Sequence, residues 1–347
     1  MGIDFGGGDE IRFERVGRAG VVTMTRAKAL NAVTHRMVRA LSAALDAWER
    51  DAEVALVIVR GEGRAFSAGG DILDIYKAGL AGNPPVGFFA DEYRLNARIA
   101  RFAKPYVALI DGIVMGGGVG VSFHGSHRVM TENALFAMPE VGIGFFPDVG
   151  GSHILPRLKD GYGMYLALTG NRIRRGDARW AGLATHCIPA AALEALLSAL
   201  CAGERPDAAI GRFAEDVPPE TDEATRRSIA RHFSGESIET IVASLTADAD
   251  SFAAATLQTI RKRSPTSVKV AFRQVRAGAN LSMDACMRME FRILTRMLAG
   301  TDFYEGIRAA IVDKGSTPVW NPATLEEVGD LAVDAYFAPP GSGDLVL

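Results

Sequence analysis

Two carboxylates, Glu140 and Asp148, lie eight residues apart in a segment that otherwise consists almost entirely of apolar residues and glycine. Each directly follows a proline, Pro139 or Pro147. A carboxylate in apolar surroundings is costly unless it is paired, hydrogen-bonded or protonated. Groups whose pKa values are shifted by such surroundings gather at catalytic sites. The segment 136–156 is therefore the first candidate for chemistry, and a carboxylate pair can supply acid–base or nucleophilic catalysis.

The same two residues also admit a structural interpretation. Asp148 precedes the run Val149–Gly151, a pattern typical of a helix N-cap. Glu140 would then be a carboxylate that closes a loop. Residue types alone leave both interpretations open, because caps and acid–base groups use the same side chains.

Two glycine runs, Gly69–Gly70 and Gly116–Gly118, each follow a predicted buried strand and precede a predicted helix. At such a turn the backbone N–H groups face a ligand, and the helix dipole adds positive potential. Two turns from neighbouring strands point two donors at one oxygen, which defines an oxyanion hole. The alternative is that these glycines only permit tight turns or close helix packing. Neither run has the spacing of a P-loop or of a dinucleotide-binding fingerprint.

The segments that carry these residues alternate between strand and helix patterns. Residues 10–25 alternate in polarity around a glycine turn, which predicts two strands. Residues 54–61 and 105–112 are continuous apolar runs, typical of strands buried on both faces. Helical spacing predicts helices over 34–50 and 85–102. The alternation predicts an α/β fold with a parallel sheet.

Beyond about residue 190 the chain becomes rich in alanine, leucine, glutamate and arginine at helical spacing. Helices are predicted over 191–202, 221–233, 238–246, 250–263, 267–277 and 282–299. We therefore predict two regions, an α/β core over 1–205 and a helical C-terminal region over 206–347. The helical region is expected to pack on the core or on a neighbouring subunit.

Composition and charge exclude several classes of protein. The 347 residues carry a formal net charge of −3 with scattered basic residues, so nucleic-acid binding is not expected. Short basic runs at 172–175 and 261–263 suit a solvated surface, with a small-anion site as the alternative. Three well-separated cysteines form no disulfide framework. With no targeting pattern and no apolar run of membrane-spanning length, we expect a cytoplasmic protein that does not contact a membrane.

The histidines do not suggest a metal site. His124 and His127 are three residues apart and His153 lies near Asp148, but no third ligand accompanies them at a recognised spacing. We predict that the protein holds no metal ion. A place for His153 at the rim of an active site is the alternative to a purely structural role.

Taken together, the motifs resemble the enoyl-CoA hydratase/isomerase (crotonase) superfamily. The stretches AFSAGGDI and IDGIVMGGGVG resemble its two oxyanion segments, and RAKALNAV resembles the segment that lines the CoA nucleotide. A hydrolase branch of the superfamily is matched, over about residues 10–325, by PEVGIGFFPDVGGSHILPRL, DEYRLN, KRSPTSVKV and DFYEGIRAAIVDKGSTPVWNP. The resemblance implies a crotonase-like spiral of repeated ββα units with a helical C-terminal region. It also implies a homo-oligomer built from trimers.

The resemblance further implies roles for individual residues. The backbone N–H groups of Gly70 and Gly117 would form the oxyanion hole for a thioester oxygen. Glu140 falls at the catalytic glutamate of the superfamily, and Asp148 at the aspartate of the hydrolase branch. Glu92, in DEYRLN, matches a residue that contacts the acyl portion of the substrate.

Coenzyme A enters as part of the substrate, and no separate cofactor is expected. The residues that the resemblance places against CoA are expected to act mostly through backbone atoms; they are Arg26, Lys28, Ala29, Leu30, Ala68, Gly69, Asp71 and Ile72. Arg26 and Lys28 carry charges that suit phosphates. The alternative is that they are solvated charges at the end of a surface strand.

Two positions, Gly120 and Asp148, distinguish this chain from the hydratases of the superfamily. Hydratases that resemble this chain at Glu140 carry a second glutamate where this chain has Gly120, and they tend to have glycine in place of Asp148. Water addition to an enoyl double bond needs two groups that handle the proton and the water. The resemblance therefore implies hydrolysis of a short, branched 3-hydroxyacyl-CoA thioester, with 3-hydroxyisobutyryl-CoA of valine catabolism as the expected substrate.

Two other functions, two mechanisms and the choice between a 3-hydroxyisobutyryl and a 3-hydroxypropionyl group stay open at this point. The alternatives are an enoyl-CoA hydratase or isomerase on the same scaffold, and a non-catalytic acyl-CoA binder. Within the hydrolase, Glu140 can serve either as a nucleophile that forms a mixed anhydride or as a general base toward water.

Overall fold

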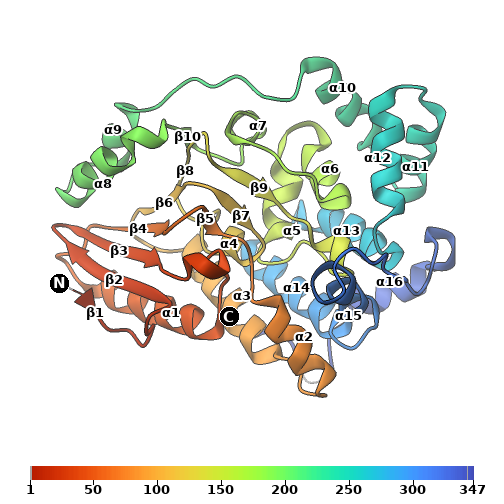
Figure 1. The fold of residues 1–347 in the computed structure, drawn as a ribbon, viewed down its shortest axis with the longest axis horizontal. Coiled ribbons are helices and arrows are strands. Elements are labelled where there is room, and N and C mark those ends of the chain that lie inside the picture. The colour runs from red at the N-terminus through yellow and green to blue at the C-terminus, as the bar shows by residue number, and fades with distance from the viewer. Residues whose placement is uncertain (1, 342) are drawn as a thin grey trace. The chain divides into compact units, whose positions relative to one another are not determined.

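The structure is a computed structural model that describes residues 2–341 and 343–347 (Figure 1). Met1, in the predicted core, and Ser342, in the predicted helical region, lie outside the described residues. The chain forms two compact units, each built from three stretches of sequence. Unit 1 comprises Met1–Asp71, Asp91–Phe136 and Ile173–Glu220, and unit 2 comprises Ile72–Ala90, Ala137–Arg172 and Thr221–Leu347.

Unit 1 is built around a sheet with the strand order β1-β2-β3-β4-β6-β8-β10 (Figure 1). The strands are β1 (Gly2–Ile3), β2 (Ile11–Val16), β3 (Ala19–Met24), β4 (Leu56–Gly61), β6 (Tyr106–Ile110), β8 (His127–Met130) and β10 (His186–Cys187). Strands β1, β2 and β3 pair antiparallel, and from β3 onward each neighbouring pair is parallel. A smaller sheet follows the order β5 (Ala65–Ser67), β7 (Ile113–Met115), β9 (Leu135–Ala137).

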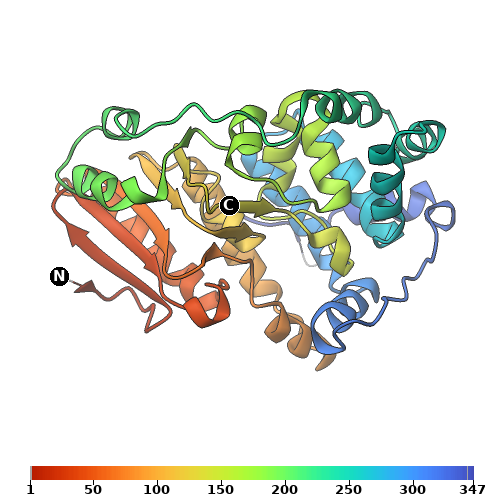
Figure 2. The ribbon, with the colours of Figure 1, turned by 45° about the horizontal axis from the view of Figure 1, so that its top comes forward.

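The central strands of unit 1 are apolar because both faces of the sheet are covered. On one face, Val21, Ile58 and Leu109 belong to the same buried cluster as Leu196 of α8 (Leu193–Cys201) and Ile210 of α9 (Pro206–Gly211). Figure 2 shows α8 lying across the strands at the red and orange end of the chain. The predicted α/β fold with a parallel sheet is confirmed for this unit.

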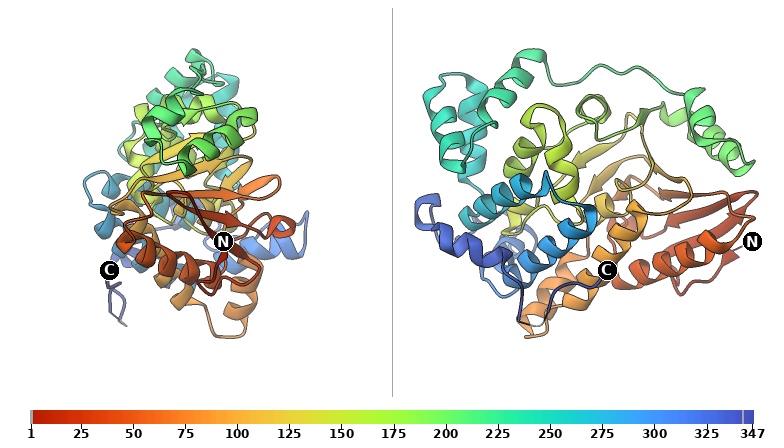
Figure 3. Two further views of the ribbon diagram at one scale, coloured as in Figure 1. Left: turned by 90° about the vertical axis from the view of Figure 1, so that its left-hand side faces the viewer. Right: turned by 180° about the vertical axis from the view of Figure 1, so that it is seen from behind.

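The opposite face of the sheet packs on α1 (His35–Arg50), which runs beside the β2–β3 hairpin (Figure 3). Thr34 caps this helix, because its side chain accepts a hydrogen bond from the N–H of Met37 at 3.2 Å. Trp48, at the far end of the buried stripe, makes an edge contact with Phe13 of β2. The remaining helices of unit 1 are α4 (Gly117–Gly120), α7 (Arg175–Ala181) and the larger part of α3 (Val86–Ala100).

Unit 2 is helical. Its helices are α2 (Ile72–Leu80), α5 (Gly151–Ile154), α6 (Tyr162–Thr169), α10 (Glu223–His232), α11 (Ile238–Ala247), α12 (Ser251–Arg261), α13 (Pro265–Gly278), α14 (Met283–Met297), α15 (Asp302–Ile307) and α16 (Asp330–Phe337). Helix α6 is buried along its whole length and packs on α10, α12 and α13. The helices predicted between 191 and 299 are confirmed within two residues at nearly every end.

Every described element that begins after residue 205 is helical. The predicted domain boundary near residue 205 nevertheless stays a prediction, because the two compact units are drawn from interleaved stretches of the chain. Among the described residues, no helix combines the length and the apolar character needed to cross a bilayer.

Candidate active site

Gly70 is held in unit 1 by a short parallel bridge to Val33. The N–H of Val33 donates to the Gly69 carbonyl at 2.8 Å, and the N–H of Asp71 donates to the Val33 carbonyl at 3.2 Å. In a parallel bridge the two neighbours of a residue make these bonds, so the N–H of Gly70 itself points away from Val33. Gly69 has a φ of +114°, a conformation that requires glycine at this turn.

Gly117 is the first residue of α4 and follows Gly116, whose φ is +46°. The first N–H groups of a helix have no acceptor within it, so the N–H of Gly117 is directed out of the helix end. A Cβ atom placed on Gly117 would lie 3.4 Å from the nitrogen of Gly70. The structure therefore brings together the two N–H groups predicted to form the oxyanion hole.

Glu92 joins these two glycines in unit 1. Its side chain is buried on α3, with 2% of the residue exposed. A Cβ atom on Gly117 would lie only 2.8 Å from Glu92 Oε1, so the carboxylate borders the space beside the two N–H groups. We call Gly70, Gly117 and Glu92 the glycine group.

The predicted CoA-binding residues occupy two segments of unit 1, apart from Ile72, the first residue of α2 in unit 2. Arg26 forms an ion pair with Asp71 at 2.9 Å and donates to the Ala32 carbonyl at 2.6 Å. These bonds tie Arg26 into the fold. Lys28, by contrast, is exposed.

Backbone contacts also join the two segments of predicted CoA-binding residues, 26–30 and 68–71. Lys28 and Ala29 lie in the short 3₁₀ turn Ala27–Ala29, and both are exposed. The N–H of Ala68 donates to the Leu30 carbonyl at 2.9 Å. The assignment of these residues to CoA stays a prediction.

Glu140 lies in unit 2, at the start of the 3₁₀ turn Glu140–Ile143, and is 6% exposed. Its Oε2 atom has no hydrogen-bond partner among the described residues. Burial raises the pKa of Glu140 well above its usual value, and the neighbouring charge of Asp148 adds to the effect. A buried carboxylate with a spare oxygen and a raised pKa has the properties of an acid–base or nucleophilic group.

Asp148 is also buried in unit 2, with 5% of the residue exposed. The interpretation of Asp148 as a helix N-cap is wrong, because α5 begins at Gly151 and its N-cap residue is Gly150. The residue between them, Val149, has a φ of +48°, which is a strained conformation for a β-branched side chain. A strained turn next to a buried carboxylate is the geometry expected of a functional site.

Glu290 of α14 is a buried carboxylate that the sequence analysis missed. Its side chain is fully buried, and burial raises its pKa to about 8, with the charge of Asp148 contributing. The helical periodicity of the sequence could have identified it. Glu290 lies on the buried stripe of an amphipathic helix, together with Cys286, Ile293 and Met297. We call Glu140, Asp148 and Glu290 the carboxylate group.

The raised pKa of Glu140 makes the stability of the protein depend on pH. The folded protein binds this proton more tightly than the unfolded chain, so stability is present near pH 4.5 and is lost as pH rises through the folded pKa. Glu140→Gln removes this titration. We expect the variant to gain stability relative to the wild type by about 1 kcal/mol per pH unit between the two pKa values.

Denaturant unfolding of both proteins between pH 5 and pH 8 measures this effect. A stability difference that stays constant across the range would contradict the raised pKa of Glu140.

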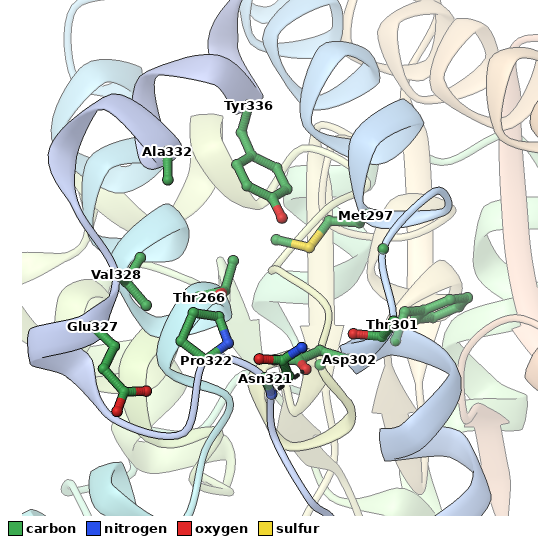
Figure 4. A pocket seen from close by; sticks show the side chains of 13 residues that line it. Thr266, Met297, Thr301, Asp302, Asn321, Pro322, Glu327, Val328, Ala332 and Tyr336 are labelled. Atoms are coloured by element: carbon green, nitrogen blue, oxygen red, sulfur yellow. Dashed lines mark hydrogen bonds between the residues drawn. The ribbon is translucent and has the colours of Figure 1, made fainter.

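A separate cavity of about 270 Å³ lies in unit 2 and is lined by residues of α13, α14, α16 and the loops around Thr301 and Asn321 (Figure 4). Figure 4 shows Met297 and the hydroxyl of Tyr336 reaching toward it. The buried carboxylate of Asp302 at this cavity accepts hydrogen bonds from Ser264 Oγ at 2.6 Å and from the N–H of Asn321 at 2.9 Å. None of the predicted site residues lines the cavity.

Other titratable side chains contribute less to the site. Burial lowers the pKa of His153 and raises the pKa of the Cys187 and Cys286 thiols to about 11, which is unfavourable for a thiolate nucleophile. Within the described residues, no group of three or more His, Cys, Asp or Glu side chains is arranged to hold a metal ion.

The fold agrees with the comparisons to known proteins. A model of the enoyl-CoA hydratase/isomerase family matches residues 19–337, and the chain belongs to this family. A protein of Danio rerio named 3-hydroxyisobutyryl-CoA hydrolase, mitochondrial, is 45% identical over 353 residues, which cover 98% of this chain and 92% of the relative.

Two solved structures have a closely similar fold. A carnitinyl-CoA dehydratase from Mycobacterium thermoresistibile has a TM-score of 0.91 and 41% identity, covering 96% of this chain and 98% of the other. An enoyl-CoA hydratase from Rhodobacter sphaeroides has a TM-score of 0.91 and 38% identity, covering 97% and 100%. The predicted crotonase-like fold with its helical C-terminal region is confirmed.

Proposed function

We propose that this protein is an acyl-CoA thioester hydrolase that converts 3-hydroxyisobutyryl-CoA to 3-hydroxyisobutyrate and coenzyme A. The observation that carries the proposal is the buried pair Glu140 and Asp148, two carboxylates close enough for the charge of one to raise the pKa of the other. The nearly full-length similarity to a protein named as this hydrolase supports the substrate. Gly120, which is buried in α4, leaves no second glutamate at that position for hydration.

In the proposed reaction the thioester oxygen accepts hydrogen bonds from the N–H groups of Gly70 and Gly117. Each donor stabilises the developing oxyanion by about 3–4 kcal/mol, the usual value for such a hole. Because both donors are backbone groups held by a bridge and a helix start, they need little rearrangement when the charge develops.

Glu140 acts at the thioester carbon by one of two routes, and both require its ionised form. As a nucleophile, it forms a C–O bond while the C–S bond breaks, and water then cleaves the mixed anhydride to release the acid and restore Glu140. As a general base, it takes a proton from the water that attacks the carbon; the C–S bond then breaks and the proton is passed to the thiolate sulfur. In both routes Asp148 orients the substrate hydroxyl or the water as the carboxylate, or in its protonated form gives a proton to the leaving thiolate.

Release of free thiol from 3-hydroxyisobutyryl-CoA tests the proposal. We expect steady thiol release from this substrate. In a separate assay with crotonyl-CoA, we expect the absorbance of the enoyl group to stay constant. The two similar solved structures, a carnitinyl-CoA dehydratase and an enoyl-CoA hydratase, favour a dehydratase or hydratase as the second candidate. Loss of enoyl absorbance without thiol release would establish that alternative, and acyl-CoA binding without either change would indicate a non-catalytic binder.

Glu92 is proposed to hold the hydroxyl of the substrate. With Glu92→Gln we expect kcat/KM for 3-hydroxyisobutyryl-CoA to fall about 10- to 100-fold, because a hydrogen bond to a charged group contributes about 1.5–3 kcal/mol. Isobutyryl-CoA, which lacks the hydroxyl, should be turned over at a nearly unchanged rate. The comparison of the two substrates in both proteins measures the specificity directly.

Asp91→Asn is the matched control on the same helix. Asp91 is paired with His35 at 2.7 Å and is partly exposed, so its loss should leave the preference for the hydroxylated substrate unchanged. An equal fall of kcat/KM for both substrates in the Glu92 variant would contradict the proposed contact.

Three further properties remain proposals. The relatives are named mitochondrial, and the first proposal is that this chain is nevertheless cytoplasmic. Assembly into trimers follows only from the resemblance, as does hydrolysis without any cofactor besides the CoA of the substrate. Cell fractionation, sedimentation and assay of the dialysed enzyme test these in turn.

A further inference from the structure

Glu290 has no role in the reaction proposed above, yet both of its carboxylate oxygens accept buried hydrogen bonds. Its Oε2 accepts a hydrogen bond from the N–H of Gly150 at 2.9 Å. Its Oε1 accepts one from the N–H of Ser152 at 3.0 Å and another from Ser152 Oγ. All these contacts are buried and join α14 to the turn that begins at Asp148, 142 residues earlier in the chain.

The turn that Glu290 holds is strained. Val149 has a φ of +48° and Gly150 a φ of +90°. A β-branched residue pays a conformational penalty at positive φ and keeps such a geometry only where the surroundings over-determine it. The bonds from Glu290 to the next residues of the turn supply that constraint.

Helix α13 supports the same turn from another side. The side chain of Gln274 donates a hydrogen bond to the carbonyl of Pro147. Gly278 lies so close to the turn that a Cβ atom there would be 1.9 Å from the carbonyl oxygen of Ser152. The backbone from Pro147 to Ser152 is thus fixed at both ends by buried groups.

We propose that Glu290 is a positioning residue for Asp148. By binding the N–H groups of Gly150 and Ser152, it holds the 147–152 turn in the conformation that keeps the Asp148 carboxylate within electrostatic reach of Glu140. This role rests on the proposed function, in which Asp148 and Glu140 share the chemistry.

Charges within the carboxylate group also shift the pKa values of Glu290 and Glu140. The charge of Asp148 raises the pKa of Glu290, and the charge of Glu290 in turn helps to raise the pKa of Glu140. Among the described residues, the groups that act on Glu290 also include the N–H of Gly150, Ser152 and the Cys286 thiol on its own helix. Replacement of Glu290 by a neutral side chain should therefore lower the pKa of Glu140.

The substitution Glu290→Gln tests the proposal because it keeps the size of the side chain but removes one of the two accepting oxygens. We expect kcat to fall about 10- to 100-fold, the usual effect of a small displacement of a catalytic group. KM should change less than about twofold, and the acidic limb of the pH–rate profile should move to lower pH. Hydrogen exchange of the backbone amides in residues 148–152 should become faster.

Ser282→Ala is the matched structural control. Ser282 caps α14 by accepting from the N–H of Ala285, so its loss weakens the same helix without touching the carboxylate group. We expect this variant to melt at a lower temperature but to keep the wild-type kcat and pH profile. If Glu290→Gln behaves in the same way, the positioning role is refuted.

Ser152→Ala is a second test of the positioning role, for the case that the Glu290 variant does not fold. It removes one donor to Glu290 and leaves both N–H bonds in place, so we expect a smaller loss of kcat, about 3- to 10-fold. An unchanged kcat in this variant would overturn the proposal. Absence of thiol release from the wild type would instead refute the proposed function, and the hydrogen-exchange comparison would still decide whether Glu290 holds the turn.

Discussion

Glu140→Gln is expected to lower kcat for 3-hydroxyisobutyryl-CoA by about 10³- to 10⁴-fold, the contribution of a well-placed acid–base group. The amide has nearly the shape of the carboxylate but can neither attack the thioester carbon nor take a proton from water. Since Glu140 is buried and its Oε2 has no partner among the described residues, the neutral side chain should fit without loss of the fold. Calorimetric titration with a non-hydrolysable acyl-CoA analogue should show that binding is retained.

Glu223→Gln provides the control for this variant. Glu223 lies at the start of α10 in unit 2 with a side chain that is 71% exposed, so the same chemical change there should leave kcat unaltered. Retention of more than about a tenth of the wild-type kcat by the Glu140 variant would remove Glu140 from the mechanism.

Gly117→Ala is expected to lower kcat/KM by about 100-fold, comparable to the loss of one donor of an oxyanion hole. The added methyl would lie 2.8 Å from Glu92 Oε1 and 3.4 Å from the nitrogen of Gly70. It therefore enters the space beside both N–H groups, where the thioester oxygen is proposed to bind. Helix α4 itself should tolerate alanine, because Gly117 has a right-handed helical backbone.

Gly211→Ala is the comparison at a helical glycine of the same unit with open space around it, since no atom lies within 4 Å of a Cβ placed there. This control should keep the wild-type kcat/KM and melting temperature. A Gly117 variant with normal kcat/KM would show that the glycine group is not the oxyanion hole.

Most helices and strands could be predicted because their signals are local. The apolar runs of β4 and β6, and the stripe of α1 that begins after Thr34, depend only on residues near them in sequence. The very short strands β1 and β10, with two residues each, could not be predicted. Two residues carry no periodicity, and the pairing partner of β10, strand β8, lies far earlier in the chain.

The order of strands also depends on tertiary structure. The sequence places β4 and β6 in one parallel sheet, but the intervening β5 belongs to the smaller sheet with β7 and β9. That division brings Gly70, in the turn after β5, close to Gly117, at the start of the helix that follows β7. The oxyanion hole was a hypothesis from two glycine runs, and their proximity became visible only in the fold.

By itself, the sequence determined the class of fold, the family, and the residue types at Glu140, Asp148, Glu92 and the two glycine turns, because these signals lie in contiguous motifs. Only the tertiary structure decided that Asp148 is not a helix cap and that Glu290 holds its strained turn. The physical reason is that burial and hydrogen bonding are set by partners far away along the chain. A glutamate on a helix has the same local sequence pattern whether its carboxylate is hydrated by solvent or accepts a hydrogen bond from a distant backbone N–H.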